Sequence, residues 1–122
     1  MNGRRAKARR RAEREHSEQQ LAAIRAAVPV RLRTTEDGQH EVFQRGPATF
    51  VVPIVPADAP AVVREAVSVH RVARLTLDCP RCPSEAKVTE AGLVYVRHRA
   101  GCVGDTEVLV RLAEEHGVAV QR

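Results

Sequence analysis

The cysteine and histidine residues between positions 79 and 102 have a spacing that suits a metal ion. All three cysteines of the chain lie in this window, as Cys-x2-Cys followed after fifteen residues by His-x3-Cys. Two cysteines with this separation lie on one tight turn, so both sulfur atoms can face a single ion. The intervening stretch is long enough for a hairpin that returns the second pair to the first. The spacing predicts a structural zinc site made of Cys79, Cys82, His98 and Cys102.

Two other interpretations of the cysteines stay open. Cys79 and Cys82 could form a redox-active pair, although such motifs normally open a helix and the residues after Pro83 favour strands. The three thiols could instead be buried and unrelated, which would leave their clustering unexplained. A closed disulfide framework cannot account for an odd number of cysteines.

The chain is not expected to be an enzyme. Four protein ligands leave no open coordination position on zinc for a water molecule. Zinc deaminases add a catalytic glutamate two residues after the ligand histidine, whereas His98 lies between Arg97 and Arg99 and has no such glutamate. No phosphate loop or Ser/His/Asp set is recognisable either.

Short strands are expected to deliver the ligands. Residues 72–78 alternate apolar and polar side chains, which predicts a strand that leads to Cys79. Residues 86–89 and 93–98 predict the two arms of a hairpin around a turn at 90–92.

The second ligand pair is expected just ahead of a helix. Period-two alternation turns His98 inward, and Gly101 gives the backbone freedom for a second sharp turn. Asp105 is a suitable N-cap and Gly117 a suitable stop for the helix that follows. The apolar face of this helix is formed by Val108, Leu109, Leu112 and Ala113.

The order of turn, hairpin and helix resembles the treble-clef and zinc-ribbon families of zinc fingers over residues 79–117. The resemblance implies that the four Cys and His residues named above bind zinc. In treble-clef fingers the second pair usually lies on the first turn of the helix, whereas Gly101 and Gly104 place it earlier here, so both families stay open. Small zinc-finger proteins of this kind are familiar from actinobacteria and their phages, and the arginine-rich composition is typical of GC-rich coding.

The middle of the chain predicts a small sheet. Residues 30–56 contain three short apolar runs, separated by turn residues at 37–38 and 45–47, which indicates a three-stranded antiparallel meander. Pro53 restricts the last run to an edge strand or a bulged strand.

A helix is predicted after Pro60, with Asp58 as its N-cap. His70 is interpreted as a packing residue of this helix, since a single histidine at helical spacing is usually part of the core. The shared face consists of Val62, Val63, Ala66, Val67 and His70.

Positive charge is concentrated at the start of the chain. Residues 1–25 carry eight basic and three acidic side chains, whereas the remainder carries twelve of each. Residues 1–14 predict an arm that is disordered when free and helical once its charge is neutralised. The apolar positions Leu21, Ile24 and Val28 then predict a helix that docks on the body.

We expect the arm to contact the phosphates of DNA or RNA, because arginine is a bidentate phosphate donor and neutralised phosphates release counterions. An acidic protein surface is the other partner that these charges allow. The alternative is a solvated tail that keeps the protein soluble. Three arginines near the metal site either extend this phosphate-binding face or hydrogen-bond the ligand sulfurs. The candidate nucleic-acid-binding residues are Arg4, Arg5, Arg9, Arg10, Arg11, Arg14, Arg81, Arg97 and Arg99.

These patterns predict an α+β fold in three segments: a basic arm and helix at 1–28, a small α+β body at 29–78 and a zinc-finger module at 79–122. The chain has no Trp, one Tyr and two Phe, so its core must consist mainly of smaller side chains, and a bound metal should add to its stability. No apolar run approaches the roughly 20 residues of a membrane span, and Arg25 interrupts the best candidate for a signal peptide. We expect a cytoplasmic protein, or one of the virion or host cytoplasm if it is phage-encoded.

Two functions follow from these features. The first is a non-enzymatic nucleic-acid-binding protein with a basic arm and a structural zinc finger. The alternative is a protein-interaction adaptor, such as a phage accessory or virion-associated protein that acts on a host or structural partner. Its docking surfaces would be the edge strand at 48–55 and the acidic C-terminal helix.

Overall fold

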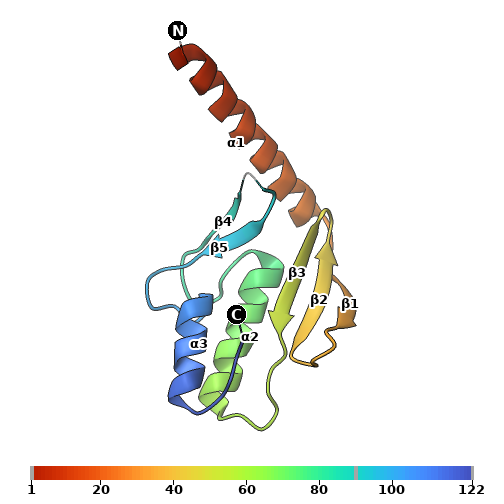
Figure 1. Cartoon of the computed structure of the whole chain (residues 1–122), viewed down its shortest axis with the longest axis vertical. Helices are drawn as coiled ribbons and strands as arrows, with labels where there is room; N and C mark the ends of the chain where they lie inside the picture. The colour runs from red at the N-terminus through yellow and green to blue at the C-terminus, as the bar shows by residue number, and fades with distance from the viewer. Residues whose placement is uncertain (1, 90, 122) are drawn as a thin grey trace.

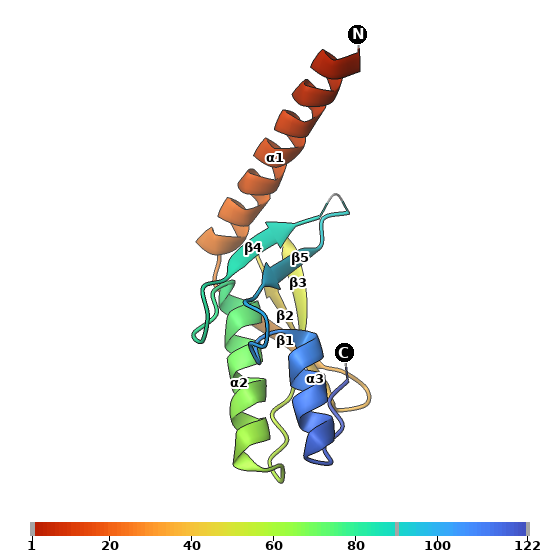
Figure 2. The same ribbon diagram turned by 90° about the vertical axis from the view of Figure 1, so that its left-hand side faces the viewer.

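A computed structural model of the chain describes residues 2–89 and 91–121, which form three helices and two small antiparallel sheets (Figure 1). This is the α+β fold that the sequence predicts. Helix α1 projects away from the other elements, whereas α2 and α3 lie side by side at the opposite end (Figure 1, Figure 2). In chain order the elements are α1 (Asn2–Ala26), β1 (Val30–Thr34), β2 (His40–Arg45), β3 (Ala48–Pro53), α2 (Ala61–Thr76), β4 (Glu85–Val88), β5 (Val94–Arg97) and α3 (Thr106–Glu115).

The basic arm forms the free part of α1, a single helix of 25 residues. Alanine and arginine are among the strongest helix formers, which favours helix over a separate coil. Ile24 is buried and Leu21 half-buried, so the docked end of the helix is confirmed. The prediction for Val28 is wrong: the helix ends at Ala26, and Val28 is 77% exposed. Its neighbour Pro29 disfavours helical backbone at the preceding residue, so Val28 cannot continue the apolar face.

The three-stranded meander is confirmed. Strands β1, β2 and β3 are antiparallel neighbours in that order, so β3, with Pro53 as its last residue, lies at an edge of the sheet. The pairing of β1 with β2 shifts between Arg31 and Arg33, and all five residues of β1 are exposed. This shift is a bulge, which leaves the two strands locally out of step.

The turn between β2 and β3 ties the ends of two helices together. Arg45 donates three hydrogen bonds, to the carbonyls of Arg25 (3.1 Å), Ala27 (2.9 Å) and Leu75 (2.9 Å). These acceptors lie at the C-terminal ends of α1 and α2, where carbonyls lack helical partners. The next residue, Gly46, has a φ of 57°, and a Cβ there would lie 3.0 Å from a carbonyl oxygen of α1. The turn therefore packs directly against α1.

Helix α2 confirms the predicted middle helix, but its start differs from the prediction. Pro60 occupies the N-cap position, and its carbonyl accepts the N–H groups of Val63 (3.0 Å) and Arg64 (3.1 Å). Asp58 is therefore not the N-cap, because it lies two residues earlier. Val62 is 45% exposed and does not share the buried face. The other predicted members of that face are buried: Val63, Ala66, Val67 and His70.

The strand predicted at 72–78 is wrong, because α2 continues through Thr76. The alternation in this stretch is compatible with a strand, but the buried residues Val69, Ala73 and Leu77 follow each other at helical intervals of four. Packing of this face therefore decides in favour of helix. Leu77 adopts the left-handed conformation, with a φ of 63°, and ends the helix just before the first ligand.

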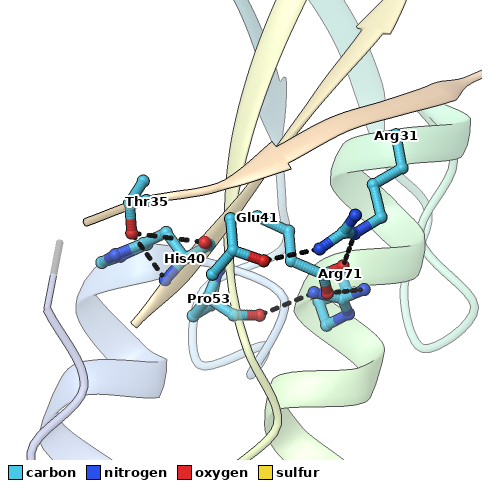
Figure 3. A network of polar contacts seen from close by, with 7 residues as sticks. Arg31, Thr35, His40, Glu41, Pro53 and Arg71 are labelled. Atoms are coloured by element: carbon cyan, nitrogen blue, oxygen red, sulfur yellow. Dashed lines mark hydrogen bonds and ion pairs between the residues drawn. The ribbon is translucent and has the colours of Figure 1, made fainter. Parts of the chain in front are cut away.

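Arg71 fixes α2 to the sheet (Figure 3). Its Nη2 lies 3.0 Å from Oε1 of Glu41, and its Nη1 donates to the Pro53 carbonyl at 2.9 Å. Glu41 also accepts a hydrogen bond of 2.7 Å from Nε of Arg31. The guanidinium carbon of Arg71 lies 5.9 Å from the centre of the Phe43 ring, a cation–π distance. With only 19% of its side chain exposed, Glu41 is screened less than a surface carboxylate.

The C-terminal third contains the predicted hairpin and helix. Strands β4 and β5 pair antiparallel, and residue 90 of the predicted turn lies outside the described residues. Asp105 precedes α3 at the N-cap position, although its side chain makes no cap hydrogen bond. Gly117, with a φ of 72°, lets the N–H of Val118 reach the Ala113 carbonyl at 2.9 Å, which ends the helix. The buried face of α3 is Leu109, Val110 and Ala113, while Val108 and Leu112 are half-buried.

Apolar clusters join parts of the chain that are distant in sequence. Five buried residues of α2 and α3 form one cluster. A second connects α1, β3, the end of α2 and β4 through Ile24, Phe50, Leu77 and Ala86. None of the three helices, over the residues described, is long and apolar enough to cross a membrane.

We predict that Glu41→Gln destabilises the protein by about 1–3 kcal/mol at neutral pH, because two guanidinium groups lose their carboxylate. Hydrogen bonding from Arg31, with Arg71 nearby, holds the pKa of Glu41 below its ordinary value of 4.5. The carboxylate therefore stabilises the fold fully above that value and less as the pH falls through its lower folded-state pKa.

Urea unfolding of the wild type and Glu41→Gln at a series of pH values measures this effect. The difference in unfolding free energy between the wild type and Glu41→Gln should become smaller at acidic pH. Glu36→Gln, at an exposed position, is the matched control. A Glu41 variant as stable as the control at neutral pH would contradict the prediction.

Candidate metal centre

The four predicted ligands lie together although they come from three places in the chain. The ligand atoms of Cys79, Cys82, His98 and Cys102 all lie within 4.8 Å of one another, so the group could hold a metal ion. The sulfur atoms of Cys79 and Cys102 are 3.7 Å apart, and that of Cys82 is 3.5 Å from Nδ1 of His98. The sequence prediction that these residues converge is confirmed.

These separations fit a tetrahedral ion. Zinc with Zn–S bonds of about 2.3 Å and a Zn–N bond of about 2.0 Å holds two sulfurs about 3.8 Å apart, and a sulfur and a nitrogen about 3.5 Å apart. Three thiolates and an imidazole are also the soft and borderline donors that zinc prefers. The donor set and its spacing are thus compatible with a metal site such as zinc.

The first pair lies on the turn that follows α2. The left-handed residue Leu77 directs the chain into this turn, and the N–H of Cys79 donates to Oγ of Ser84 at 2.9 Å. Cys79 is buried against Val69 and Ala73 of α2, whereas Cys82 is half-buried and precedes β4. Neither cysteine opens a helix, in contrast to the arrangement of redox-active pairs.

The second pair lies between β5 and α3. His98 directly follows the end of β5, and Cys102 precedes the first residue of α3, Thr106. This position ahead of the helix is the one predicted. Gly101 has a φ of 84° at the sharp turn between the two ligands, as expected for glycine there.

Each ligand sulfur accepts one backbone N–H. The donors are Arg81 to Cys79 (3.4 Å), Arg99 to Cys82 (3.5 Å) and Gly104 to Cys102 (3.4 Å). Such hydrogen bonds stabilise the negative charge of a thiolate. The hydrogen bonds of Arg81 and Arg99 to the sulfurs therefore come from the main chain, not from the guanidinium groups.

Burial and hydrogen bonding act differently on the thiols. Burial raises the pKa of Cys102 to about 11, whereas the N–H of Arg99 lowers the pKa of Cys82. A metal ion binds thiolates, so its binding must displace the firmly held proton of Cys102. Metal affinity should consequently fall steeply as the pH is lowered.

Gly104 leaves space for the ligands, a role that the sequence did not reveal. A Cβ at this position would lie 2.5 Å from Cε1 and 2.8 Å from Nδ1 of His98, and 3.1 Å from the sulfur of Cys79. Real Cβ atoms do not approach so closely. A residue larger than glycine would therefore push the imidazole or the sulfur away from the cluster.

His70 supports the loop of the second pair from behind. It is 6% exposed, and its Nδ1 lies 2.8 Å from the Gly104 carbonyl, to which it donates. Burial lowers the pKa of His70 and thereby favours the neutral ring. The packing role of His70 was predicted from the sequence. Its hydrogen bond to Gly104 was not, because the two residues are 34 positions apart.

The candidate nucleic-acid-binding residues fall into two groups. The six arginines of the arm are exposed along the free part of α1. Near the metal centre, Arg97 and Arg99 are also exposed, whereas the guanidinium of Arg81 pairs with Glu65 of α2. Arg10 and Arg14 line a groove together with Glu85 and Lys87 of β4, whereas the three arginines near the metal centre are not among the described residues that line it.

We predict that Gly104→Ala lowers metal affinity by at least tenfold, because the added methyl group overlaps the imidazole. Competition with a chromophoric chelator measures the affinity. Gly3→Ala is the matched control, since a Cβ there meets nothing within 4 Å. If both variants bind zinc as the wild type does, the proposed crowding at Gly104 is wrong.

Comparison of the chain with protein-family models, with curated proteins and with solved structures finds no match in any of the three. The resemblance to treble-clef and zinc-ribbon fingers thus rests on the ligands and the elements that carry them. What the protein does has to be inferred from its own geometry.

Proposed function

We propose that the protein is a zinc-stabilised, non-enzymatic nucleic-acid-binding protein that contacts phosphates through α1. The observation that carries this proposal is the exposure of every basic side chain from position 4 to 14 on a helix that projects from the body (Figure 2). Zinc supplies a fixed tetrahedral link between the hairpin and the two helices beside it. With four protein ligands, the ion has a structural role.

The basic residues of α1 form an ordered stripe. Arg4, Lys7, Arg11 and Arg14 follow each other at intervals of three and four residues, which places them on one face of the helix. Each step advances about 4.5–6 Å along the axis. A row of guanidinium groups at such intervals is suited to the phosphates along a nucleic-acid strand, to which arginine binds in a bidentate manner.

The same charges repel one another along the free helix, and a bound polyanion would reduce this repulsion. Basic residues stand four apart in three pairs, and each such pair destabilises an isolated helix by about 0.2–0.5 kcal/mol. One compensating pair is Arg9 with Glu13, at 3.9 Å. Binding of phosphates would remove the repulsion and release counterions, so nucleic acid should also increase the stability of α1.

The remainder of the molecule offers less for such contacts. Its basic and acidic residues balance, and several arginines are held by carboxylates, as Arg31 and Arg71 are by Glu41. The exposed Arg97 and Arg99 next to the metal centre are the second contact that we propose, and they would orient the ligand without reading bases.

Zinc content is the first test. Protein purified under reducing conditions should contain one zinc per chain, and a strong chelator or Cys79→Ser should unfold at least the region from 79 to 117. Circular dichroism with metal analysis measures both, and renewed folding after added zinc is the control. Well under one zinc per chain would refute the zinc assignment.

The second test is the salt dependence of binding. We compare Lys7→Gln/Arg11→Gln/Arg14→Gln with Arg33→Gln/Arg64→Gln/Arg111→Gln, which removes the same charge from exposed positions of the body. The α1 variant should lower the slope of log affinity against log salt by about 3 for duplex DNA, because each lost phosphate contact contributes about 0.9.

Fluorescence anisotropy with duplex DNA and with RNA, from low to physiological salt, measures the slopes. The body variant should bind like the wild type. Equal slopes for both variants, or no binding at low salt, would contradict the proposal.

A second candidate is a protein-interaction adaptor, which one observation favours. Strand β1 lies at the edge of its sheet, and its apolar residues Val30 and Leu32 are 57% and 51% exposed. An exposed edge can accept a strand from another protein. Recovery of one defined protein after nuclease treatment, abolished by Leu32→Lys, would support this candidate.

A further inference from the structure

Arg74, in the last turn of α2, is half-buried and forms no ion pair within the described part of the chain. Its Nε is inaccessible and has no hydrogen-bond partner among the described residues. By contrast, Arg71, one turn earlier, binds Glu41.

A guanidinium whose Nε is buried without a hydrogen-bond partner is unfavourable. Burial alone lowers the pKa of Arg74, yet arginine stays protonated in proteins, so the charge persists. A buried charge costs free energy unless an opposite charge or hydrogen-bond acceptors compensate it. An anion that accepts a hydrogen bond from Nε would offset the cost of leaving this group without a partner.

Two cavities flank this side chain. One has a volume of about 140 Å³ and the other about 180 Å³, and both are lined by His70, Arg74 and Thr106. The larger cavity also contains Asp105 and the candidate ligand His98. Among the described residues, no acidic side chain lines the smaller cavity, whose other polar lining residues are His40 and Gln121.

We propose that the smaller cavity binds one oxyanionic group, a phosphate or a carboxylate, of a small molecule. Arg74 would supply the charge, and the hydroxyl of Thr106, the His40 ring and the Gln121 amide are the other polar groups of its wall. Thr106 is the first residue of α3, where the positive end of the helix dipole favours an anion. Pro53, Leu109 and Val120 would cover the remainder of the group.

The size of the cavity separates this site from the nucleic-acid contact proposed for α1. A volume of about 140 Å³ admits a single phosphate or carboxylate group, not a polymer strand. The site is also next to the metal centre, because His70 lines it and holds the Gly104 carbonyl. Occupancy of the site should therefore stabilise the loop that carries Cys102.

Thermal unfolding of the zinc-loaded full chain, without free zinc, tests the proposal. Inorganic phosphate and acetate are titrated separately at constant ionic strength, with chloride as the reference. For the preferred anion, each tenfold increase above its Kd should raise the melting temperature of the wild type by about 5 °C. The phosphate and acetate arms identify which oxyanion the site takes.

Arg74→Met keeps the length of the side chain and removes its charge. This variant should lose the response to the anion and, without anion, melt at the same or a higher temperature than the wild type. Arg64→Gln, on the exposed side of the same helix, should respond like the wild type. So should Lys7→Gln/Arg11→Gln/Arg14→Gln, which separates this site from α1.

Three outcomes would overturn the proposal. The first is a wild type that responds to neither anion, and the second is an Arg74→Met variant that responds as the wild type does. The third is a lower melting temperature of Arg74→Met without anion, since it would mean that the chain itself already compensates the charge. None of these bears on the binding of nucleic acid by α1.

Discussion

The convergence of three sulfurs and one imidazole is the constraint on which the C-terminal half of the molecule depends. It joins the end of α2, the hairpin of β4 and β5 and the approach to α3. Each of the three sulfurs also accepts a main-chain N–H, so these hydrogen bonds fix the backbone of the loops as well as the positions of the sulfurs. In a chain with so few aromatic residues, a metal ion held by these four side chains would cross-link the elements and could take the place of a larger apolar centre.

Charge is distributed in two different ways along the chain. Within the body, carboxylates hold several arginines, and the resulting pairs fix neighbouring elements, as between Glu41 and Arg71. On α1 the basic groups are mostly unpaired and exposed. Charge pairs thus connect elements within the body, whereas the basic side chains of the arm are exposed to solvent.

Features that depend on local spacing were predictable from the sequence. The metal ligands, the hairpin and the meander follow from residue types at short intervals, and each lies where the pattern placed it. The end of α2 was not predictable in this way, because 72–78 has both a two-residue and a four-residue pattern. Only the packing of Ala73 and Leu77 distinguishes them.

Contacts between residues far apart in the chain were also not predictable, because they produce no recognisable pattern in the sequence. The bond from His70 to Gly104 and the unpartnered Nε of Arg74 depend on how α2 and α3 meet. The crowding of a Cβ at Gly104 against His98 is likewise a property of the folded loop. A glycine in a sequence indicates freedom of the backbone, but not which atom occupies the space beside it.

The hydrogen bonds of Arg45 have a consequence for how the molecule meets a large ligand. They anchor the root of α1 to the end of α2, and Gly46 lets the strand turn press against the same helix. The direction of α1 relative to the body is consequently fixed at its C-terminal end, unlike that of a flexible linker. A ligand that contacts both the N-terminal end of α1 and the surface beside the hairpin would find the two sites at a constant distance. Once one contact has formed, the effective concentration for the other would depend on this distance, not on the flexibility of the chain.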